Sequence, residues 1–66
     1  MAVAKTLEII SSSTESIEGA VRDGLAKAAE TVQGIQEAWV QGTKAIVREG
    51  KVAEWRVTLR ITFIVE

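Results

Sequence analysis

The chain has 66 residues, 47% of them hydrophobic, with no Cys, no His, no Pro and a formal net charge of −1. Eight Lys and Arg are scattered among nine acidic residues, which argues against nonspecific nucleic-acid binding because there is no basic run. The absence of Cys and His excludes disulfides and most zinc sites, so a domain this small is expected to gain stability by self-association.

The chain is expected to form a single domain over residues 1–66. Its first apolar stretch is too short for a signal peptide and contains Lys5 and Glu8, and no segment approaches the length of a membrane span. We therefore expect a cytoplasmic protein that does not contact a membrane.

The first expected element is a strand over residues 3–10, whose alternate residues give one well-buried face. The serine-rich segment after it is expected to end the strand and begin a helix, because hydroxyl side chains bond nearby backbone groups. Ser12 with Glu15 fits a capping box, and Ser16 is a second candidate N-cap.

A helix is expected next, since apolar residues recur at steps of three and four. These residues are Ile17, Ala20, Val21, Leu25, Ala28, Val32 and Ile35. Gly34 is predicted to lie just past the end of the helix, where a left-handed conformation costs glycine nothing.

The last third of the chain predicts two strands, over residues 38–47 and 52–66, joined by a turn. With Glu49-Gly50 as a two-residue loop, Arg48 faces Lys51. The same unbroken register places Val47 opposite Val52, Val40 opposite Leu59, Trp39 opposite Arg60 and Lys44 beside Trp55.

This register sorts the hairpin into an apolar face and a polar face. The apolar face holds Trp55, Val57, Leu59, Ile61 and Phe63 with Ala38, Val40 and Ile46. The polar face holds Arg56, Thr58, Arg60 and Thr62 with Glu37, Trp39, Gln41 and Thr43. The fold class that follows is α+β, with one helix on the apolar face of a three-stranded sheet and Trp39 on the opposite side.

Four stretches in this order resemble the dodecin family: "KTLEIISSS", "SSSTESIEGAV", "AAETV" and above all "EGKVAEWRVTLRITF". The resemblance covers nearly the whole chain. It implies a β-α-β-β subunit with a three-stranded antiparallel sheet partly wrapped around one helix, assembled from trimers into a hollow homododecamer. It also implies noncatalytic binding and storage of a flavin, riboflavin or FMN, stacked on a second-strand tryptophan where subunits meet.

Two positions depart from the flavin-binding branch of that family. A gapless count back from Trp55 puts the stacking position at Glu37, and Arg56 stands where a glutamine usually bonds the flavin ring. Trp39 shares the face of Glu37, about 7 Å further along the strand. In this respect the chain resembles relatives that lack the usual tryptophan and have been associated with calcium, although one carboxylate per subunit serves calcium only at a symmetry axis.

The candidate ligand site on the polar face has Trp39 as a stacking platform, Gln41, Arg56 and Arg60 as polar contacts, and Glu37 beside the ring. The competing interpretation makes Trp39 an interface anchor and pairs the arginines with acidic residues. In that case the protein is a structural or calcium-stabilised shell that binds no flavin. Trp55 is expected to pack in the core.

An enzyme is not expected. The run Ser11–Ser13 offers hydroxyls, but the chain has no His to orient a nucleophile. The serines are therefore expected to cap the helix.

Overall fold

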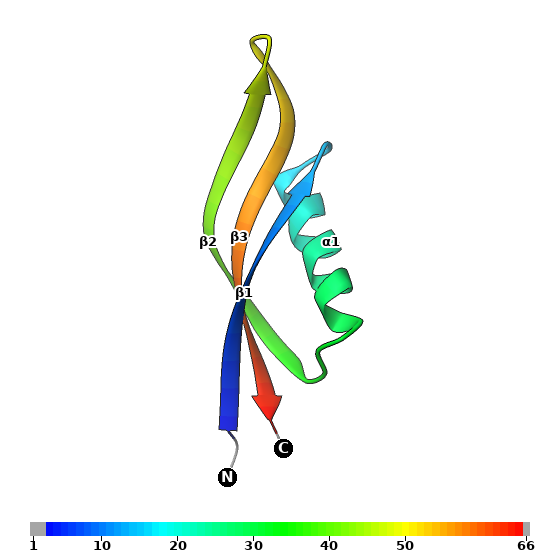
Figure 1. The fold of residues 1–66 in the computed structure, drawn as a ribbon, viewed down its shortest axis with the longest axis vertical. Coiled ribbons are helices and arrows are strands. Elements are labelled where there is room, and N and C mark those ends of the chain that lie inside the picture. The colour runs from blue at the N-terminus through cyan, green and yellow to red at the C-terminus, as the bar shows by residue number, and fades with distance from the viewer. Residues whose placement is uncertain (1–2, 66) are drawn as a thin grey trace.

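The computed structural model describes residues 3–65 and contains a strand, a helix and two further strands. The elements are β1 (Val3–Ser13), α1 (Ile17–Ala29), β2 (Ile35–Arg48) and β3 (Lys51–Val65) (Figure 1). The strands form one antiparallel sheet in the order β1-β3-β2, so β3 is central and β1 and β2 are both edges. The expected α+β architecture is confirmed. The predicted last strand reaches Glu66, which lies outside the described residues.

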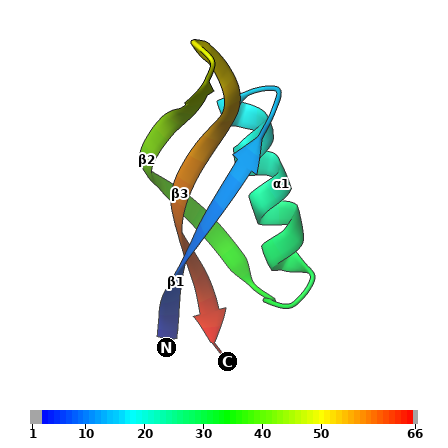
Figure 2. The ribbon, with the colours of Figure 1, turned by 45° about the horizontal axis from the view of Figure 1, so that its top comes forward.

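Helix α1 covers one face of the sheet, mainly over β1 and β3 (Figure 2). Ala20 of the helix and Val57, Leu59 and Ile61 of β3 are fully buried. Partly buried residues surround them: Leu7, Ile9, Val21, Leu25, Ala28, Ile35 and Ala38. The alternation predicted for β3 thus places its apolar residues under the helix.

Strand β1 continues three residues further than predicted. Ser11, Ser12 and Ser13 pair with residues of β3 instead of leaving the sheet. The local preference of serine for turns is overridden because β3 supplies regular backbone partners for these residues.

The helix begins at Ser16, the second of the two predicted caps. Its Oγ accepts a hydrogen bond from the Gly19 backbone N–H at 2.8 Å. The capping box predicted for Ser12 and Glu15 is wrong, because Ser12 is still paired within β1. The Ser13 Oγ instead accepts a bond from the Glu15 N–H at 3.0 Å.

The helix also ends earlier than predicted, at Ala29, with Glu30 as its C-cap. Val32 and Ile35 lie beyond it. Gly34 has the predicted left-handed backbone, with φ of 77°, but it lies in the connection to β2. Its carbonyl accepts a hydrogen bond from the Ile64 N–H at 3.0 Å, so its role is to bring the chain back to the sheet.

The turn between β2 and β3 is the predicted two-residue loop. Glu49 and Gly50 have φ of 53° and 75°, the combination of a type I′ turn. The pairs predicted at both ends of the hairpin are confirmed: Arg48 with Lys51, Val47 with Val52, Val40 with Leu59 and Trp39 with Arg60.

Between these ends the register differs from the prediction by one residue. Shifts occur between Val40 and Gly42 and between Ile46 and Val47. They leave Gln41 on β2 and Ala53 on β3 as the extra residues of two β-bulges. Because these two bulges are on opposite strands, one cancels the other, and the predicted pairing returns at Val40 and Trp39. A third shift, between Ile35 and Glu37, lies near the start of β2.

In the segment of β2 between the two bulges, the side chains lie on the face opposite to the predicted one. Its pairs are Gly42 with Thr58, Thr43 with Val57, Lys44 with Arg56, Ala45 with Trp55 and Ile46 with Glu54. Thr43 therefore shares the helix-side face, and Ile46 lies on the opposite face, each contrary to prediction. Lys44, predicted beside Trp55, also moves to the face away from the helix.

The subunit is elongated, because the β2–β3 hairpin extends beyond the helix (Figure 1). Its radius of gyration is 13.5 Å, against about 10.8 Å for a compact domain of this length. Its accessible surface is 4889 Å², against about 4,100 Å² for a folded monomer of this mass. This excess surface is typical of a subunit that is completed by association.

Candidate functional site

The face of the sheet away from α1, here called the outer face, carries the candidate ligand site. Four rows of residues cross its three strands in the order β1, β3, β2. The rows are Thr6, Thr62 and Glu37; Glu8, Arg60 and Trp39; Ile10, Thr58 and Gly42; and Ser12, Arg56 and Lys44. Side chains within a row are direct cross-strand neighbours, with Cβ atoms about 5 Å apart.

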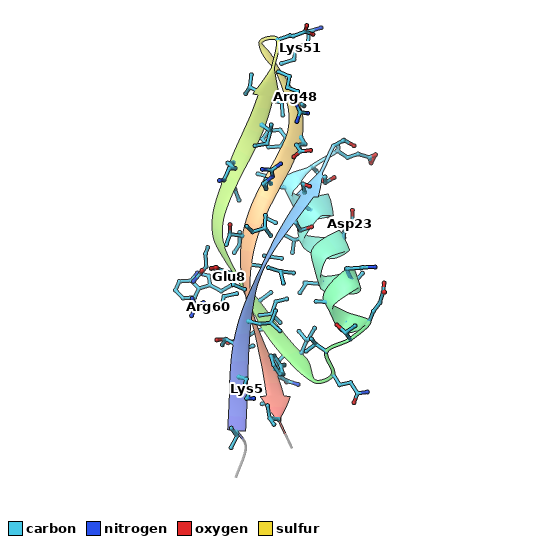
Figure 3. All side chains as sticks on the ribbon, in the orientation of Figure 1. Lys5, Glu8, Asp23, Arg48, Lys51 and Arg60 are labelled. Carbon is cyan, nitrogen blue, oxygen red and sulfur yellow. The ribbon has the colours of Figure 1, made fainter. Side chains whose placement is uncertain are left out.

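Trp39 is the dominant aromatic group of this face. Its side chain is 66% exposed, and it lies opposite Arg60, as predicted. Arg60 also faces Glu8 from β1, and both side chains lie on the side of the sheet away from the helix (Figure 3). The row therefore offers a flat ring next to a guanidinium whose other neighbour is a carboxylate, a setting suited to cation–π stacking.

Arg56 lies two rows from Arg60 on the same face. It forms an ion pair with Glu54, and its side chain is 39% exposed. This ion pair is consistent with the competing interpretation of Arg56 as a salt-bridge residue. Across the sheet, however, Arg56 faces Lys44, so two cations share the row.

The remaining two predicted site residues have different positions. Glu37 is exposed and lies opposite Thr62, in the row next to Trp39. The shared face that the sequence predicts for Glu37 and Trp39 is therefore confirmed. Gln41 is exposed but has no cross-strand partner, because it is the extra residue of the bulge. The unbroken register predicted around it is wrong, and its polar contact with a ligand stays a prediction.

Three residues of the outer face were not predicted as site residues. Glu8 joins the row of Trp39 only through the pairing of β1 with β3, a long-range register that local sequence does not specify. Lys44 and Gly42 reach the face through the bulge at Gln41. The one available signal was the glycine inside a strand pattern, since such a residue often marks a bulge.

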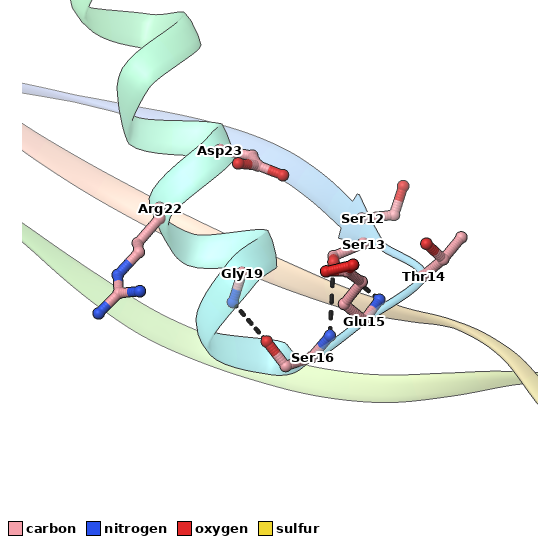
Figure 4. Close-up of a pocket in the computed structure, with 8 residues that line it drawn as sticks. All are labelled: Ser12, Ser13, Thr14, Glu15, Ser16, Gly19, Arg22 and Asp23. Carbon is pink, nitrogen blue, oxygen red and sulfur yellow. Dashed lines mark hydrogen bonds between the residues drawn. The ribbon is translucent and has the colours of Figure 1, made fainter.

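The serine-rich segment forms a shallow pocket at the start of α1 (Figure 4). Ser13 and Ser16 use their Oγ atoms as acceptors for the backbone N–H groups of Glu15, Ser16 and Gly19. Arg22, which also lines the pocket, pairs with Glu18 at 2.7 Å. The predicted capping role is therefore confirmed for Ser13 and Ser16, whereas Ser11 and Ser12 pair with β3 instead.

Within residues 3–65, no three His, Cys, Asp or Glu side chains are grouped closely enough to hold a metal ion. A calcium site involving Glu37 would need carboxylates from several copies. In the same part of the chain no helix is long and apolar enough to cross a membrane.

The chain thus combines a small sheet with one face covered by a helix, a row with an exposed tryptophan on the other face, and a large accessible surface for its mass. A family model described as Dodecin matches residues 3–66. The chain belongs to the dodecin family.

Solved structures agree with this assignment. A point mutant of the Thermus thermophilus dodecin has a TM-score of 0.94 and 29% identity, covering 100% of this chain and 98% of that one. Dodecin from Streptomyces coelicolor has a TM-score of 0.94 and 25% identity, over 98% of this chain and 93% of that one. Dodecin from Streptomyces davaonensis, at 23% identity and a TM-score of 0.94 over 98% and 96% of the two chains, shares the fold. A search of curated proteins gave no match.

Proposed function

We propose that this protein binds and stores a flavin without catalysis, at sites formed between subunits of a homo-oligomer. The observation that carries the proposal is Trp39, 66% exposed on the outer face of the sheet beside Arg60. A bulky ring left in water this way indicates a partner surface or a planar ligand. If two subunits met at Trp39, a flavin could stack on one face of the indole and the neighbouring subunit could cover the other face.

The surface of the isolated subunit supports the intersubunit location. Exposed apolar side chains remain on both faces, including Ile10 at 69% and Val47 at 60%. Association would bury them and offset the small core. Assembly as a dodecamer built from trimers, in the cytoplasm, remains part of the proposal.

In the proposed site Trp39 stacks on the ring and Arg60 engages its oxygens. Arg56 and Gln41 lie further along the same hairpin and supply polar contacts. The site includes no general acid or base with a partner, so the bound flavin is held and shielded rather than turned over.

A fluorescence titration tests the proposal. Purified protein is added to riboflavin, and the flavin emission is expected to fall to a saturating level as the ring stacks on Trp39. Trp39→Ala should abolish the quenching while the native mass of the assembly is unchanged. Trp55→Phe is the matched control and should still quench, because Trp55 lies on the helix-side face.

Two outcomes contradict the proposal. Loss of assembly in Trp39→Ala would make Trp39 an interface anchor. Absence of quenching by wild-type protein at high concentration would remove flavin as the ligand.

A second candidate function is a calcium-stabilised shell that binds no flavin. Glu37 favours it, since an exposed carboxylate next to Trp39 disfavours a ring with electron-rich oxygens and suits a cation. This candidate predicts that calcium raises the thermal midpoint of the wild type and has no effect on Glu37→Gln.

A further inference from the structure

We propose that Glu37 makes the site at Trp39 prefer a planar ring whose edge carries two adjacent N–H donors, the aminopyrimidinone edge of guanine and of pterins, over the ring of a flavin. The inference rests on the stacking site of the proposed function. It adds the residue that determines which ring binds more tightly, so that flavin is the weaker of two classes of ligand.

Glu37 is an exposed carboxylate on the outer face of β2. Its cross-strand neighbour is the neutral residue Thr62. None of the side-chain hydrogen bonds and ion pairs formed within residues 3–65 involves Glu37. Glu54, on the same hairpin, is by contrast paired with Arg56. Both side-chain oxygens of Glu37 are therefore available as acceptors for a ligand.

The carboxylate and the indole are close enough to act on one ligand. Glu37 and Trp39 are two residues apart on the same face of β2, and no register shift falls between them. Their Cα atoms are therefore about 7 Å apart along the strand. Trp39 is 66% exposed, so a bicyclic ring can stack on its indole while the edge of that ring meets the side chain of Glu37.

A carboxylate distinguishes ring edges because its oxygens only accept hydrogen bonds. Guanine and pterins present a ring N–H beside an amino group, and a carboxylate accepts both bonds in parallel, as it does from arginine. Flavin presents a single N–H between two carbonyl oxygens. A carboxylate that accepts this one bond brings its other oxygen against a carbonyl oxygen, and the unmatched polar groups lower the affinity.

Arg60 complements the selection by Glu37. It lies opposite Trp39 on β3, two residues before Thr62, the neighbour of Glu37. Guanine and pterins carry a carbonyl oxygen next to the ring N–H that Glu37 would bind, and a guanidinium donates to such an oxygen. The carboxylate on β2 and the guanidinium on β3 together match the donors and the acceptor of this edge.

Two matched pairs of ligands test the selection. Inosine is guanosine without the amino group, and lumazine has a carbonyl oxygen where pterin has the amino group. Dissociation constants are measured by isothermal titration calorimetry for wild type, Glu37→Gln and Glu49→Gln. Glu49→Gln is the matched control, since it removes the same charge from the turn of the same hairpin.

We expect wild type and Glu49→Gln to bind guanosine and pterin about tenfold more tightly than inosine and lumazine. Glu37→Gln should lose this difference, because its amide offers one acceptor instead of two. The pair that contains the tighter ligand identifies whether the preferred ring is a purine or a pterin.

Riboflavin should respond to the same substitution with the opposite sign. The amide of glutamine accepts the N–H of the flavin edge and donates to the neighbouring carbonyl oxygen. Glu37→Gln should therefore bind riboflavin several-fold more tightly than wild type does. General damage to the outer face would weaken both classes of ligand and would contradict the selection.

The outcomes separate failure of the selection from failure of the proposed function. If wild type bound riboflavin but bound the two members of each pair equally, the selection would be overturned and flavin storage would remain. An affinity difference that persisted in Glu37→Gln would also overturn it. If guanosine or pterin bound in a Glu37-dependent manner and riboflavin did not bind, the selection would stand and flavin storage would fall. If wild type bound none of the five ligands, both would fall.

Discussion

The two faces of the sheet differ in how much of their environment one subunit provides. On the helix-side face, Val57, Leu59 and Ile61 are fully buried within a single chain. On the outer face, Trp39 is 66% exposed and Ile10 is 69% exposed. The helix-side face thus has a core that one chain completes around Leu59, although Val40 and Val47 on the hairpin remain exposed, whereas no residue of the tryptophan row on the outer face is buried.

The difference separates stability from function in the same strand. Leu59 and Arg60 are consecutive in β3, yet one is under the helix and the other borders the candidate site. Substitutions on the helix side should therefore change unfolding, and substitutions on the outer face should change binding or assembly.

Leu59→Ala is expected to lower the free energy of unfolding by about 2–5 kcal/mol, because it leaves a cavity in a fully buried position. Thr58→Ala, one residue away on the outer face, should cost less than about 1 kcal/mol. Urea unfolding of both variants at one protein concentration measures the contrast, since association contributes to apparent stability. Similar losses for the two variants would show that the faces are not energetically distinct.

The same contrast explains which parts of the fold could be predicted. Alternation in β3 identifies its buried residues, and Glu49-Gly50 identifies the turn, because both signals are local. The family resemblance follows from these stretches as well. The positions of Trp39 and Glu37 on one face were also predictable, since no bulge falls between them.

The rest of the outer face depends on long-range pairing. Two bulges on opposite strands cancel, so neither the turn nor the far end of the hairpin shows that the segment around Lys44 is displaced. Glu8 enters the site only through the pairing of β1 with β3. The helix ends early for a similar reason, because the chain must return to β3 at Gly34 and Ile64.

Gly24→Ala tests how tightly the helix packs on β1. Alanine in a helix is ordinarily favoured over glycine by about 1 kcal/mol. Here, however, the added Cβ would lie 2.8 Å from the Ser11 Cβ, so the helix or the strand must move. We expect a net loss of about 1–3 kcal/mol in the free energy of unfolding, as for overpacked cores.

Two further variants make the Gly24 prediction specific. The double variant Ser11→Gly/Gly24→Ala should recover part of the loss, because the clashing atoms are removed. Gly42→Ala on the outer face should leave the free energy of unfolding unchanged or slightly higher, since its Cβ would meet no atom within 4 Å. A stabilising effect of Gly24→Ala would show that the two elements are loosely packed.

Ser16→Ala is expected to have the smallest effect, a loss of about 1 kcal/mol, because the N–H of Gly19 loses its acceptor. Ser16→Asp should retain most of the stability, since a carboxylate caps the same N–H and suits the positive end of the helix. Ser12→Ala should be nearly neutral, as Ser12 is exposed and its backbone remains paired with Arg56. Thermal midpoints of the three variants measure these effects. An equal loss in Ser12→Ala and Ser16→Ala would show that Ser12 also caps the helix, as the predicted capping box of Ser12 and Glu15 requires.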